Sequence, residues 1–358
     1  GGDEFVVVMS GAISSKSGVA KAEDILQIMR QPVDLAEQQL TVLSSIGIAL
    51  SENGRIDAEH LLQHADLAMY KAKQSGRNTF RLFTDDMEQT VRQRFKLEVA
   101  LPDAIVKNQF FLHYQPKADC YSNEIIGFEA LLRWQHPEYG LIPPGDFIPI
   151  IDEGNLVIEI GEWVLNEVCR QLAQWRQQGL PTLPIAVNIS GHHLHSPSLL
   201  PCVKQILNAH AIDSELIEIE ITEGVLTSHT EHSIAVMSAL KSLGIKLSVD
   251  DLGTGYSSLS YLKNFPIDIL KIDQTFVRDA ASNIEDGAIC KAIISLAKSL
   301  DLQIIAEGVE TPAQLAFLRQ EKCHSYQGYL FSRPLPAEAV PRLLSQLDGK
   351  AGNMANPA

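Results

Sequence analysis

The chain has 358 residues, a formal charge of −15 at pH 7 and a 45% hydrophobic composition. Its length exceeds that of one small domain and its apolar content is ample for a buried core, so we expect one large and one smaller domain. The acidic balance argues against nucleic-acid polymers and anionic membrane surfaces as partners, because both need clustered Lys and Arg.

The cysteines and the first residues of the chain indicate the cellular compartment. Five scattered cysteines form no CxxC pair, which predicts a reducing, cytoplasmic compartment and offers no zinc signature. No apolar run is long enough to cross a bilayer. The chain opens on Gly1 without a signal-like segment. We therefore expect a fragment of a longer bacterial protein, either cytoplasmic or the cytoplasmic portion of a membrane-attached one.

The first part of the chain mixes two kinds of run. The strand-like runs read FVVVMS and LTVLSSIGIAL, and the helix-like runs read KAEDILQIMRQ and HLLQHADLAMYKAKQSG. We assign residues 1–83 to a small α+β unit. Residues 84–109 are polar, helix-prone and free of glycine, so we expect a helical connector there.

From about Phe110 the pattern becomes a regular alternation of apolar strands and helices. The strand candidates read FFLHYQ, IIGFEALLRW, PIAVNIS, IEIEIT, KLSVD, ILKID, QIIAEGV and SYQGYLF. Apolar residues at helical spacing lie between them, as in Leu165, Val168, Leu172 and Trp175, and in Ile289, Ala292, Ile293 and Leu296. The alternation predicts a (β/α)8 barrel, with a doubly wound open sheet as the competitor. The first two strands are separated by PKADCYSNE, which is too short for a helical crossover, so this pair should be antiparallel.

A barrel carries its functional residues at the carboxyl ends of its strands. Polar residues near those ends are Gln115, Glu129, Asn188, Glu220, Asp250, Lys271, Glu307 and Gln327. Buried charges are costly unless they are paired or bind a metal, so packing is a poor explanation for such a set. Carboxylates and an amide oxygen, without His or Cys, select Mg²⁺ or Mn²⁺ over zinc or copper.

Two adjacent aspartates stand in LSVDDLGTG at residues 247–255. Neighbouring strand residues point to opposite faces, so Asp250 and Asp251 cannot both be ordinary strand positions facing one pocket. One of them could simply cap the following helix. Alternatively, Asp250 ends the strand, Asp251 begins the turn, and a carboxylate bridges two ions about 3.5–4 Å apart that assist attack of water on a phosphodiester.

Longer motifs carry a family resemblance. The run GFEALLRWQHPEYGLIPPGDFIPI is followed in order by AVNIS, EITE, DDLGTGYSSLSYL, LKID, AEGVE and QGYLFSRP, and preceded by HYQP. Over about residues 95–346 this set resembles the EAL-domain phosphodiesterases, which hydrolyse cyclic di-GMP to linear pGpG. The resemblance implies a TIM-like (β/α)8 barrel with one antiparallel strand. Leu252 stands where the family has phenylalanine, which affects loop packing or dimer contacts but removes no ligand.

The resemblance also implies roles for individual residues. Two ions of Mg²⁺ or Mn²⁺ would be held by Glu129, Asn188, Glu220, Asp250, Asp251 and Glu307. Glu307 would be the general base, Lys271 would orient the water or balance charge, and Glu223 would pin the loop after Asp251. A simple ion-pair partner at the barrel mouth is the alternative for Lys271. The substrate would be lined by Gln115, Leu131, Arg133 and Gln327. Arg133 can clamp a phosphate with two hydrogen bonds, although a surface ion pair for Arg133 and a backbone hydrogen bond for Gln115 remain alternatives.

The first residues resemble a second family. GGDEF at residues 1–5, with SIGIAL and ADLAMYKAKQSGRN further on, is similar to GGDEF-domain diguanylate cyclases. The resemblance implies contacts to GTP or its metal ion by Asp3, Glu4, Lys73 and Arg77. The upstream half of that domain does not occur in this sequence, so we do not expect the chain alone to synthesise cyclic di-GMP.

Four segments follow from these patterns. They are a partial GGDEF domain at 1–83, a connector at 84–109, an EAL barrel at 110–346 and a disordered tail at 347–358. The expected activity is metal-dependent hydrolysis of cyclic di-GMP. A non-catalytic cyclic di-GMP receptor, a bifunctional cyclase and phosphodiesterase in a longer parent, and a metal-dependent lyase are the alternatives. The resemblance further implies a homodimer formed through residues 253–262.

Overall fold

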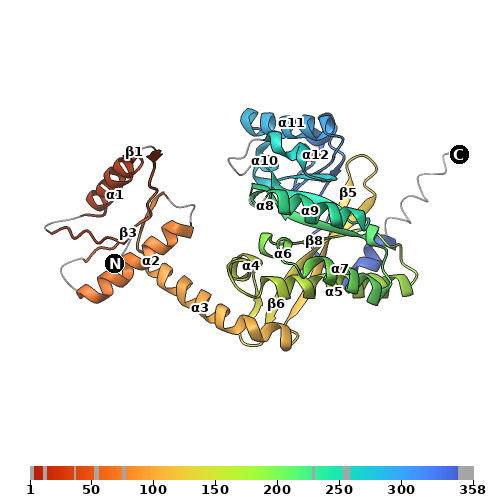
Figure 1. Ribbon diagram of the computed structural model, residues 1–358, viewed down its shortest axis with the longest axis horizontal. Coiled ribbons are helices and arrows are strands. Elements are labelled where there is room, and N and C mark those ends of the chain that lie inside the picture. Colours follow the sequence, from red (N-terminus) through yellow and green to blue (C-terminus); the bar gives the residue numbers. More distant parts are fainter. Residues whose placement is uncertain are drawn as a thin grey trace. The chain divides into compact units, whose positions relative to one another are not determined.

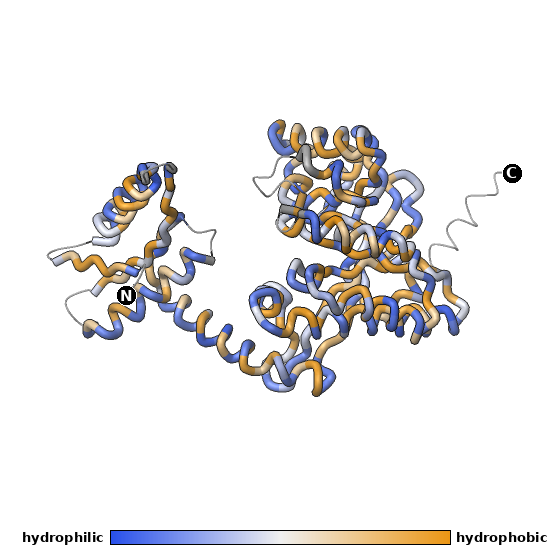
Figure 2. Tube along the Cα trace, viewed as in Figure 1, coloured by the Kyte–Doolittle hydropathy of each residue, from blue (hydrophilic) through white to orange (hydrophobic). Residues whose placement is uncertain are grey.

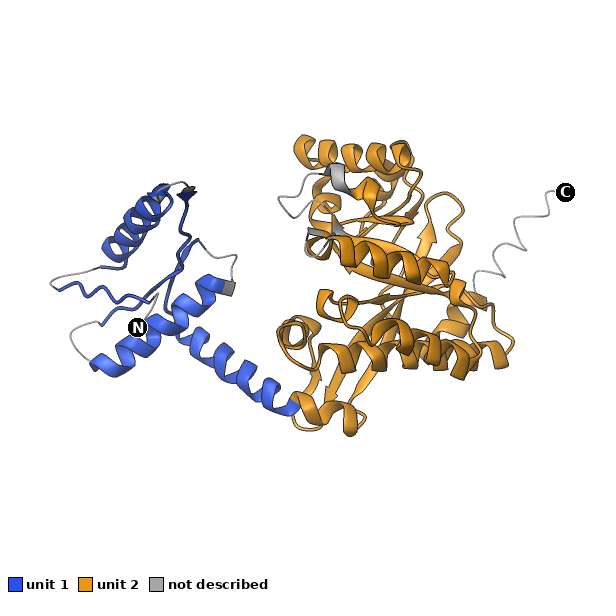
Figure 3. Cartoon of the chain, in the orientation of Figure 1, with its two compact units in different colours: residues 1–100 blue, residues 101–358 orange. Residues whose placement is uncertain are grey.

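The computed structural model describes residues 4–10, 14–35, 38–51, 56–74, 78–227, 230–252 and 259–345. The chain divides into two compact units, residues 1–100 and residues 101–358 (Figure 3). The boundary falls inside helix α3 (Asp85–Val106). The expected tail at 347–358 lies outside the described residues.

Unit 1 combines helices with short strands (Figure 1). Its elements are α1 (Ser15–Met29), β1 (Val33–Leu35), β2 (Gln38–Leu40), β3 (Ile46–Ile48), α2 (Ala58–Gln74) and β4 (Phe80–Leu82). The β1–β2 pair is antiparallel and the β3–β4 pair is parallel. At Gly47 a Cβ would lie 1.9 Å from the carbonyl oxygen of Ala65, so glycine is what lets β3 approach α2 this closely.

One expectation for unit 1 is wrong. The apolar run FVVVMS at residues 5–10 forms no strand, and Phe5 is 88% exposed. No strand in the described part of unit 1 pairs with this run. Strand-like composition is insufficient here because a strand needs a neighbour to accept its backbone hydrogen bonds.

Unit 2 contains a closed barrel. Among its described residues, eight strands form the ring in the order β5, β13, β12, β11, β10, β9, β8 and β6, and a β5–β6 pairing closes it. Their bounds are β5 (Phe110–Asp119), β6 (Ile125–His136), β8 (Ile185–Asn188), β9 (Ile217–Thr222), β10 (Lys246–Leu252), β11 (Ile269–Ile272), β12 (Gln303–Ala306) and β13 (Ser325–Tyr326).

The strand directions confirm the predicted barrel. Strand β5 runs antiparallel to β6 and β13, and the other neighbouring strands of the ring are parallel to each other. Two short strands, β7 (Gly140–Ile142) and β14 (Leu335–Pro336), extend β6 and β5 outside the ring. The first strand, β5, pairs both with β6 and with the last strand, β13. The ring therefore has no open edge, and the doubly wound alternative is excluded.

Helices pack around the barrel. They are α4 (Pro144–Glu153), α5 (Val157–Gln177), α6 (Gly191–Leu194), α7 (Leu199–His210), α8 (Glu223–Thr227), α9 (Thr230–Ser242), α10 (Gln274–Asp279), α11 (Ile284–Ser299) and α12 (Pro312–Gln320). Short 3-10 helices lie at η2 (Ser214–Leu216), η3 (Leu259–Asn264) and η4 (Ala337–Ala339). Hydrophobic and hydrophilic stretches alternate along the helices, as expected for one buried face each (Figure 2). None of the described helices has the length and apolar content to cross a bilayer.

The two predicted apolar stripes behave differently. In α5 all four expected residues are buried, and Trp175 meets Tyr114 of β5 with ring centroids 5.0 Å apart. In α11 the buried face is made by Gly287, Cys290, Ile293, Ile294 and Ala297, while Ile289 is exposed. Gly287 lies on the buried face, where a Cβ would come within 2.9 Å of the carbonyl oxygen of Ala280, the residue that follows α10. Close packing against that neighbour therefore sets which face of α11 is buried.

Candidate active site

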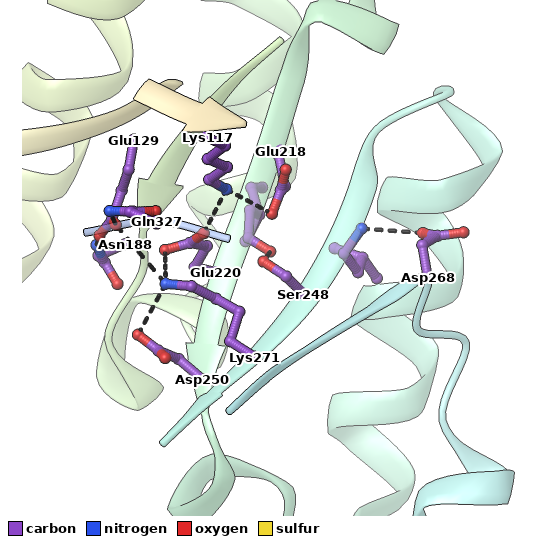
Figure 4. A network of polar contacts seen from close by, with 12 residues as sticks. Lys117, Glu129, Asn188, Glu218, Glu220, Ser248, Asp250, Asp268, Lys271 and Gln327 are labelled. Atoms are coloured by element: carbon purple, nitrogen blue, oxygen red, sulfur yellow. Dashed lines mark hydrogen bonds and ion pairs between the residues drawn. The ribbon is translucent and has the colours of Figure 1, made fainter. Parts of the chain in front are cut away.

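Most of the polar residues predicted at the barrel mouth come together inside unit 2, and Figure 4 shows Glu129, Asn188, Glu220, Asp250, Lys271 and Gln327. The register places Asn188 of β8 opposite Glu220 of β9, and Asp250 of β10 opposite Thr222. Glu129 comes from β6 and Lys271 from β11. The polar positions come from separate strands, so the site exists only because the barrel closes.

The ammonium of Lys271 lies among four carboxylates. Its Nζ is 2.5 Å from Glu307 Oε1, 2.8 Å from Glu220 Oε2, 3.2 Å from Asp250 Oδ2 and 3.7 Å from Glu129 Oε2. Lys271 is fully buried. Burial alone would lower its pKa, but attraction to the carboxylates outweighs this and holds the pKa of Lys271 well above its usual value. The lysine is therefore a permanent cation at the centre of the site.

Two amides hold the carboxylate of Glu129. Asn188 Nδ2 donates to Glu129 Oε1 at 2.8 Å, and Gln327 Nε2 donates to Glu129 Oε2 at 2.6 Å. Gln327 Nε2 also donates to Gln115 Oε1 at 3.1 Å. The buried Gln327 Oε1 has no hydrogen-bond partner among the described residues. A buried acceptor of this kind is a position where a ligand donor or an ion can be received.

Burial and the positive charges of Lys117 and Lys271 give these carboxylates different pKa values. Burial raises the pKa of Glu307 to about 8, with Lys271 opposing the rise. Burial and the charge of Glu220 likewise raise the pKa of Glu129. Burial would also raise the pKa of Glu220, but Lys117 and Lys271 together lower it to about 2. Glu220 is thus a fixed anion, whereas Glu307 can exchange a proton near neutral pH.

Lys117 is a site neighbour that the sequence reasoning missed. Its Nζ lies 2.8 Å from Glu220 Oε1 and 3.0 Å from Glu218 Oε1, and all three side chains are buried. The sequence patterns put Lys117 in the link after FFLHYQ, but β5 continues to Asp119. With the longer strand, the two-residue period puts Lys117 on the same face as Gln115, as it puts Glu218 on the same face as Glu220.

The remaining predicted residues of the barrel lie around this cluster. Arg133 is partly buried, its Nη1 donates to the carbonyl of Leu132 at 2.8 Å, and no described carboxylate lies within ion-pair distance of it. Leu131 is also partly exposed, and Glu223 is buried at the start of α8. Leu252 is fully buried, so the position keeps an apolar side chain packed in the barrel.

Part of the predicted set falls outside what can be located. The expectation that Asp250 ends the strand and Asp251 begins the turn is wrong, because β10 continues to Leu252, with an irregular pairing to β11 between Val249 and Leu252. The side chain of Asp251 lies outside the described residues, as do residues 253–258. In unit 1, Asp3 and Arg77 are likewise outside them. The other two predicted residues of unit 1 do come together, with Lys73 Nζ 4.0 Å from Glu4 Oε1.

The donor set of the barrel fits a hard divalent cation. It consists of carboxylate and amide oxygens, which Mg²⁺ and Mn²⁺ prefer. Within the part of the chain that is described, no group of three or more Asp, Glu, His or Cys side chains is already arranged around a metal-ion position; four carboxylates lie around the ammonium of Lys271. Five buried or partly buried carboxylates (Glu129, Glu218, Glu220, Asp250 and Glu307) face two lysines, so the cluster carries −5 + 2 = −3 when fully ionised. An anionic substrate would be repelled unless further cations bind.

Comparisons with known proteins agree with this arrangement. Residues 98–334 match the EAL domain, and residues 1–79 match the diguanylate cyclase, GGDEF domain. MucR of Pseudomonas aeruginosa, a bifunctional diguanylate cyclase/cyclic di-GMP phosphodiesterase, is 40% identical over 95% of this chain and 50% of its own length. PdeR of Escherichia coli, a cyclic di-GMP phosphodiesterase, is 41% identical over 96% of this chain and 51% of its own length. The chain therefore spans about half the length of these curated relatives.

Solved structures extend the comparison. The PaMucR phosphodiesterase in complex with c-di-GMP is 42% identical with a TM-score of 0.66, over 68% of this chain and 99% of that one. The EAL enzyme Bd1971, bound to cAMP and cyclic di-GMP, is 30% identical with a TM-score of 0.68, over 81% of this chain and 77% of that one. The closed barrel, the polar cluster and these matches lead to one conclusion: the chain belongs to the EAL-domain family, and a GGDEF-domain segment precedes its EAL domain.

Proposed function

We propose that the barrel hydrolyses cyclic di-GMP to linear pGpG with the help of divalent metal ions. The observation that carries the proposal is the convergence of Glu129, Asn188, Glu220, Asp250 and Glu307 on one buried centre. The substrate is supported by the relatives, since MucR and PdeR are named as cyclic di-GMP phosphodiesterases and PaMucR binds c-di-GMP in its structure.

EAL phosphodiesterases as a class depend on divalent metal ions. In this chain, two ions of Mg²⁺ or Mn²⁺ would be held by Glu129, Asn188, Glu220, Asp250, Asp251 and Glu307. When bound, such ions supply positive charge for the phosphodiester and lower the pKa of bound water. The excess of carboxylates over lysines in the cluster supports this proposal, because that negative charge needs balancing before an anion can enter.

Glu307 is the proposed general base. Its pKa of about 8, raised by burial, puts its carboxylate in the range where it accepts a proton from water near neutral pH. Lys271, 2.5 Å from Glu307 Oε1, holds this carboxylate in place and balances its charge. Lys271 would also orient the attacking water, and with Asp251 it completes the proposed catalytic set.

Arg133 is the proposed phosphate clamp. Its planar guanidinium can give two parallel hydrogen bonds to a phosphate, and no described carboxylate neutralises it. Gln115, Leu131 and Gln327 would line the substrate beside it. Glu223 would support the loop that follows Asp251.

The proposal has a direct test. Purified protein with Mn²⁺ should convert cyclic di-GMP to pGpG, identified by mass spectrometry of the products. Glu129→Gln should lower the rate by more than the roughly 10–100-fold typical of losing an outer-shell partner of a metal ligand, whereas the exposed Glu138→Gln should keep the rate of the wild-type chain. Binding of cyclic di-GMP without turnover in the wild type would identify a receptor instead, and an unchanged rate in Glu129→Gln would remove the site assignment.

Unit 1 is proposed to bind GTP through Asp3, Glu4, Lys73 and Arg77, in keeping with its GGDEF match. Residues 253–262 are the proposed homodimer contact of the barrel. The five free cysteines support a reducing, cytoplasmic compartment. The domain limits 1–83, 84–109 and 110–346 are proposed on the same sequence patterns.

A further inference from the structure

A second buried ammonium lies beneath the proposed active site. The side chain of Lys117 is 2% exposed, and its Nζ donates to Glu218 Oε1 at 3.0 Å and to Glu220 Oε1 at 2.8 Å (Figure 4). Glu218 and Glu220 both come from β9 and point to the same side, since they are two residues apart on one strand. Lys117 therefore links an outer carboxylate of the site to a deeper one.

The antiparallel strand β5 explains this position. Gln115 pairs with Glu129 on β6, whereas Lys117 pairs with Gly127, two residues nearer the amino end of β6. On a parallel strand, a residue two positions after Gln115 would lie closer to the mouth of the barrel. On β5 it lies deeper, so Lys117 approaches Glu220 from the side away from the barrel mouth.

The two lysines divide the two oxygens of Glu220. Oε1 accepts from Lys117 and Oε2 accepts from Lys271, each at 2.8 Å. Lys271 is shared with Glu129, Asp250 and Glu307, whereas the ion pairs of Lys117 within the described residues go to β9 alone. A carboxylate held at one oxygen from behind keeps its other oxygen directed at the centre of the site.

We infer that Lys117 is a positioning residue for Glu220, which it holds by one carboxylate oxygen so that the other faces the cation-binding centre. Glu218 in turn holds Lys117. The inference rests on the proposed phosphodiesterase function and extends it to a residue that touches neither the substrate nor the reacting atoms. Removing such a supporting group typically changes metal affinity or activity by about 10–100-fold.

Three proteins separate positioning from plain stability: the wild type, Lys117→Met, and the double variant Lys117→Met/Glu218→Gln. The single variant leaves Glu218 buried without its partner, which is costly for folding. The double variant removes that unpaired charge and restores a neutral, hydrogen-bonding side chain. Circular dichroism measures folding, titration calorimetry with Mn²⁺ alone measures metal affinity, and pGpG formation measures kcat and KM.

If Lys117 positions Glu220, the double variant folds but binds Mn²⁺ about 10–100-fold more weakly than the wild type. Its kcat falls at a fixed Mn²⁺ concentration, while its KM for cyclic di-GMP is unchanged because Lys117 does not touch the substrate. Wild-type Mn²⁺ affinity in the folded double variant would overturn the inference, and so would failure of both variants to fold, since the pair would then serve the barrel itself.

The two proposals fail separately in this experiment. A wild-type chain that binds Mn²⁺ but yields no pGpG removes the phosphodiesterase proposal, while the calorimetric comparison still decides the role of Lys117. A wild-type chain that yields pGpG, with equal Mn²⁺ affinity in the double variant, removes only the role of Lys117.

Discussion

The two units use the same residue types in opposite surroundings. In unit 1, Lys73 and Glu4 lie 4.0 Å apart with side chains 46% and 62% exposed. In the barrel, Lys117, Lys271 and Glu220 meet at 2.8 Å and are almost completely buried. Exposed pairs contribute at most about 1 kcal/mol because water and salt screen them. Burial removes this screening. In the barrel the same side chains therefore have shifted pKa values and need oppositely charged neighbours.

The largest expected difference is in stability. Lys271→Met leaves buried carboxylates without their shared cation and should lower the free energy of unfolding by about 3–5 kcal/mol in EDTA. Lys73→Met, the matched change in unit 1, should cost at most about 1 kcal/mol. Urea unfolding of both variants measures the contrast, and similar losses would show that burial does not distinguish the two lysines.

The second-largest expected difference between the two units is in stabilisation by a bound metal ion. Saturating Mn²⁺, at about 100 times its Kd, should stabilise the folded chain by about 2.7 kcal/mol, seen as a rise in Tm. Glu220→Gln should remove this rise, because it takes away a charged oxygen at the centre of the cluster. Glu23→Gln, on an exposed position of α1, is the control and should keep it. An equal rise in Glu220→Gln would place the ion elsewhere.

Stability of the barrel should depend on pH through Glu307. Its pKa is raised by burial to about 8 from a usual value of 4.5, so the folded state favours the protonated form. Its contribution to stability is complete below pH 4.5 and is lost as the pH rises through 8, with a slope of at most about 1.4 kcal/mol per pH unit. In EDTA, Glu307→Gln should flatten this part of the stability curve measured by urea unfolding. The idea fails if the variant and the wild type lose stability in parallel over that range.

The smallest expected difference is in the stability lost when a helix cap is removed from each unit. Ser14 of α1 and Thr311 of α12 each form a capping box. In α12 the partner Gln314 is buried and also donates to the carbonyl of Arg278 at 2.8 Å, which ties the cap to α10. Replacing a capping side chain with Ala costs about 0.5–2 kcal/mol. Hydrogen exchange of the helix amides measures this loss of stability. The loss should be near the upper end of that range for Thr311→Ala and near the lower end for Ser14→Ala, and the reverse order would contradict the role of burial.

Much of the barrel could be read from local patterns. The spacing of apolar runs predicted its strands, and the short PKADCYSNE link predicted the antiparallel β5–β6 pair. Polar residues at strand ends predicted the cluster around Lys271. Strand composition failed for FVVVMS in unit 1, and hydropathy misplaced the buried face of α11, because neither pattern contains the neighbouring element.

The sequence by itself determined the order of strands and helices, the family, and which oxygen-bearing residues could share a site, since these depend on local spacing and residue type. Only the tertiary structure decided that Lys271 lies among four carboxylates and that Lys117 supports Glu220 from below. Those contacts depend on closure of the barrel and on the reversed direction of β5, which bring together residues about 100 positions apart, such as Lys117 and Glu220.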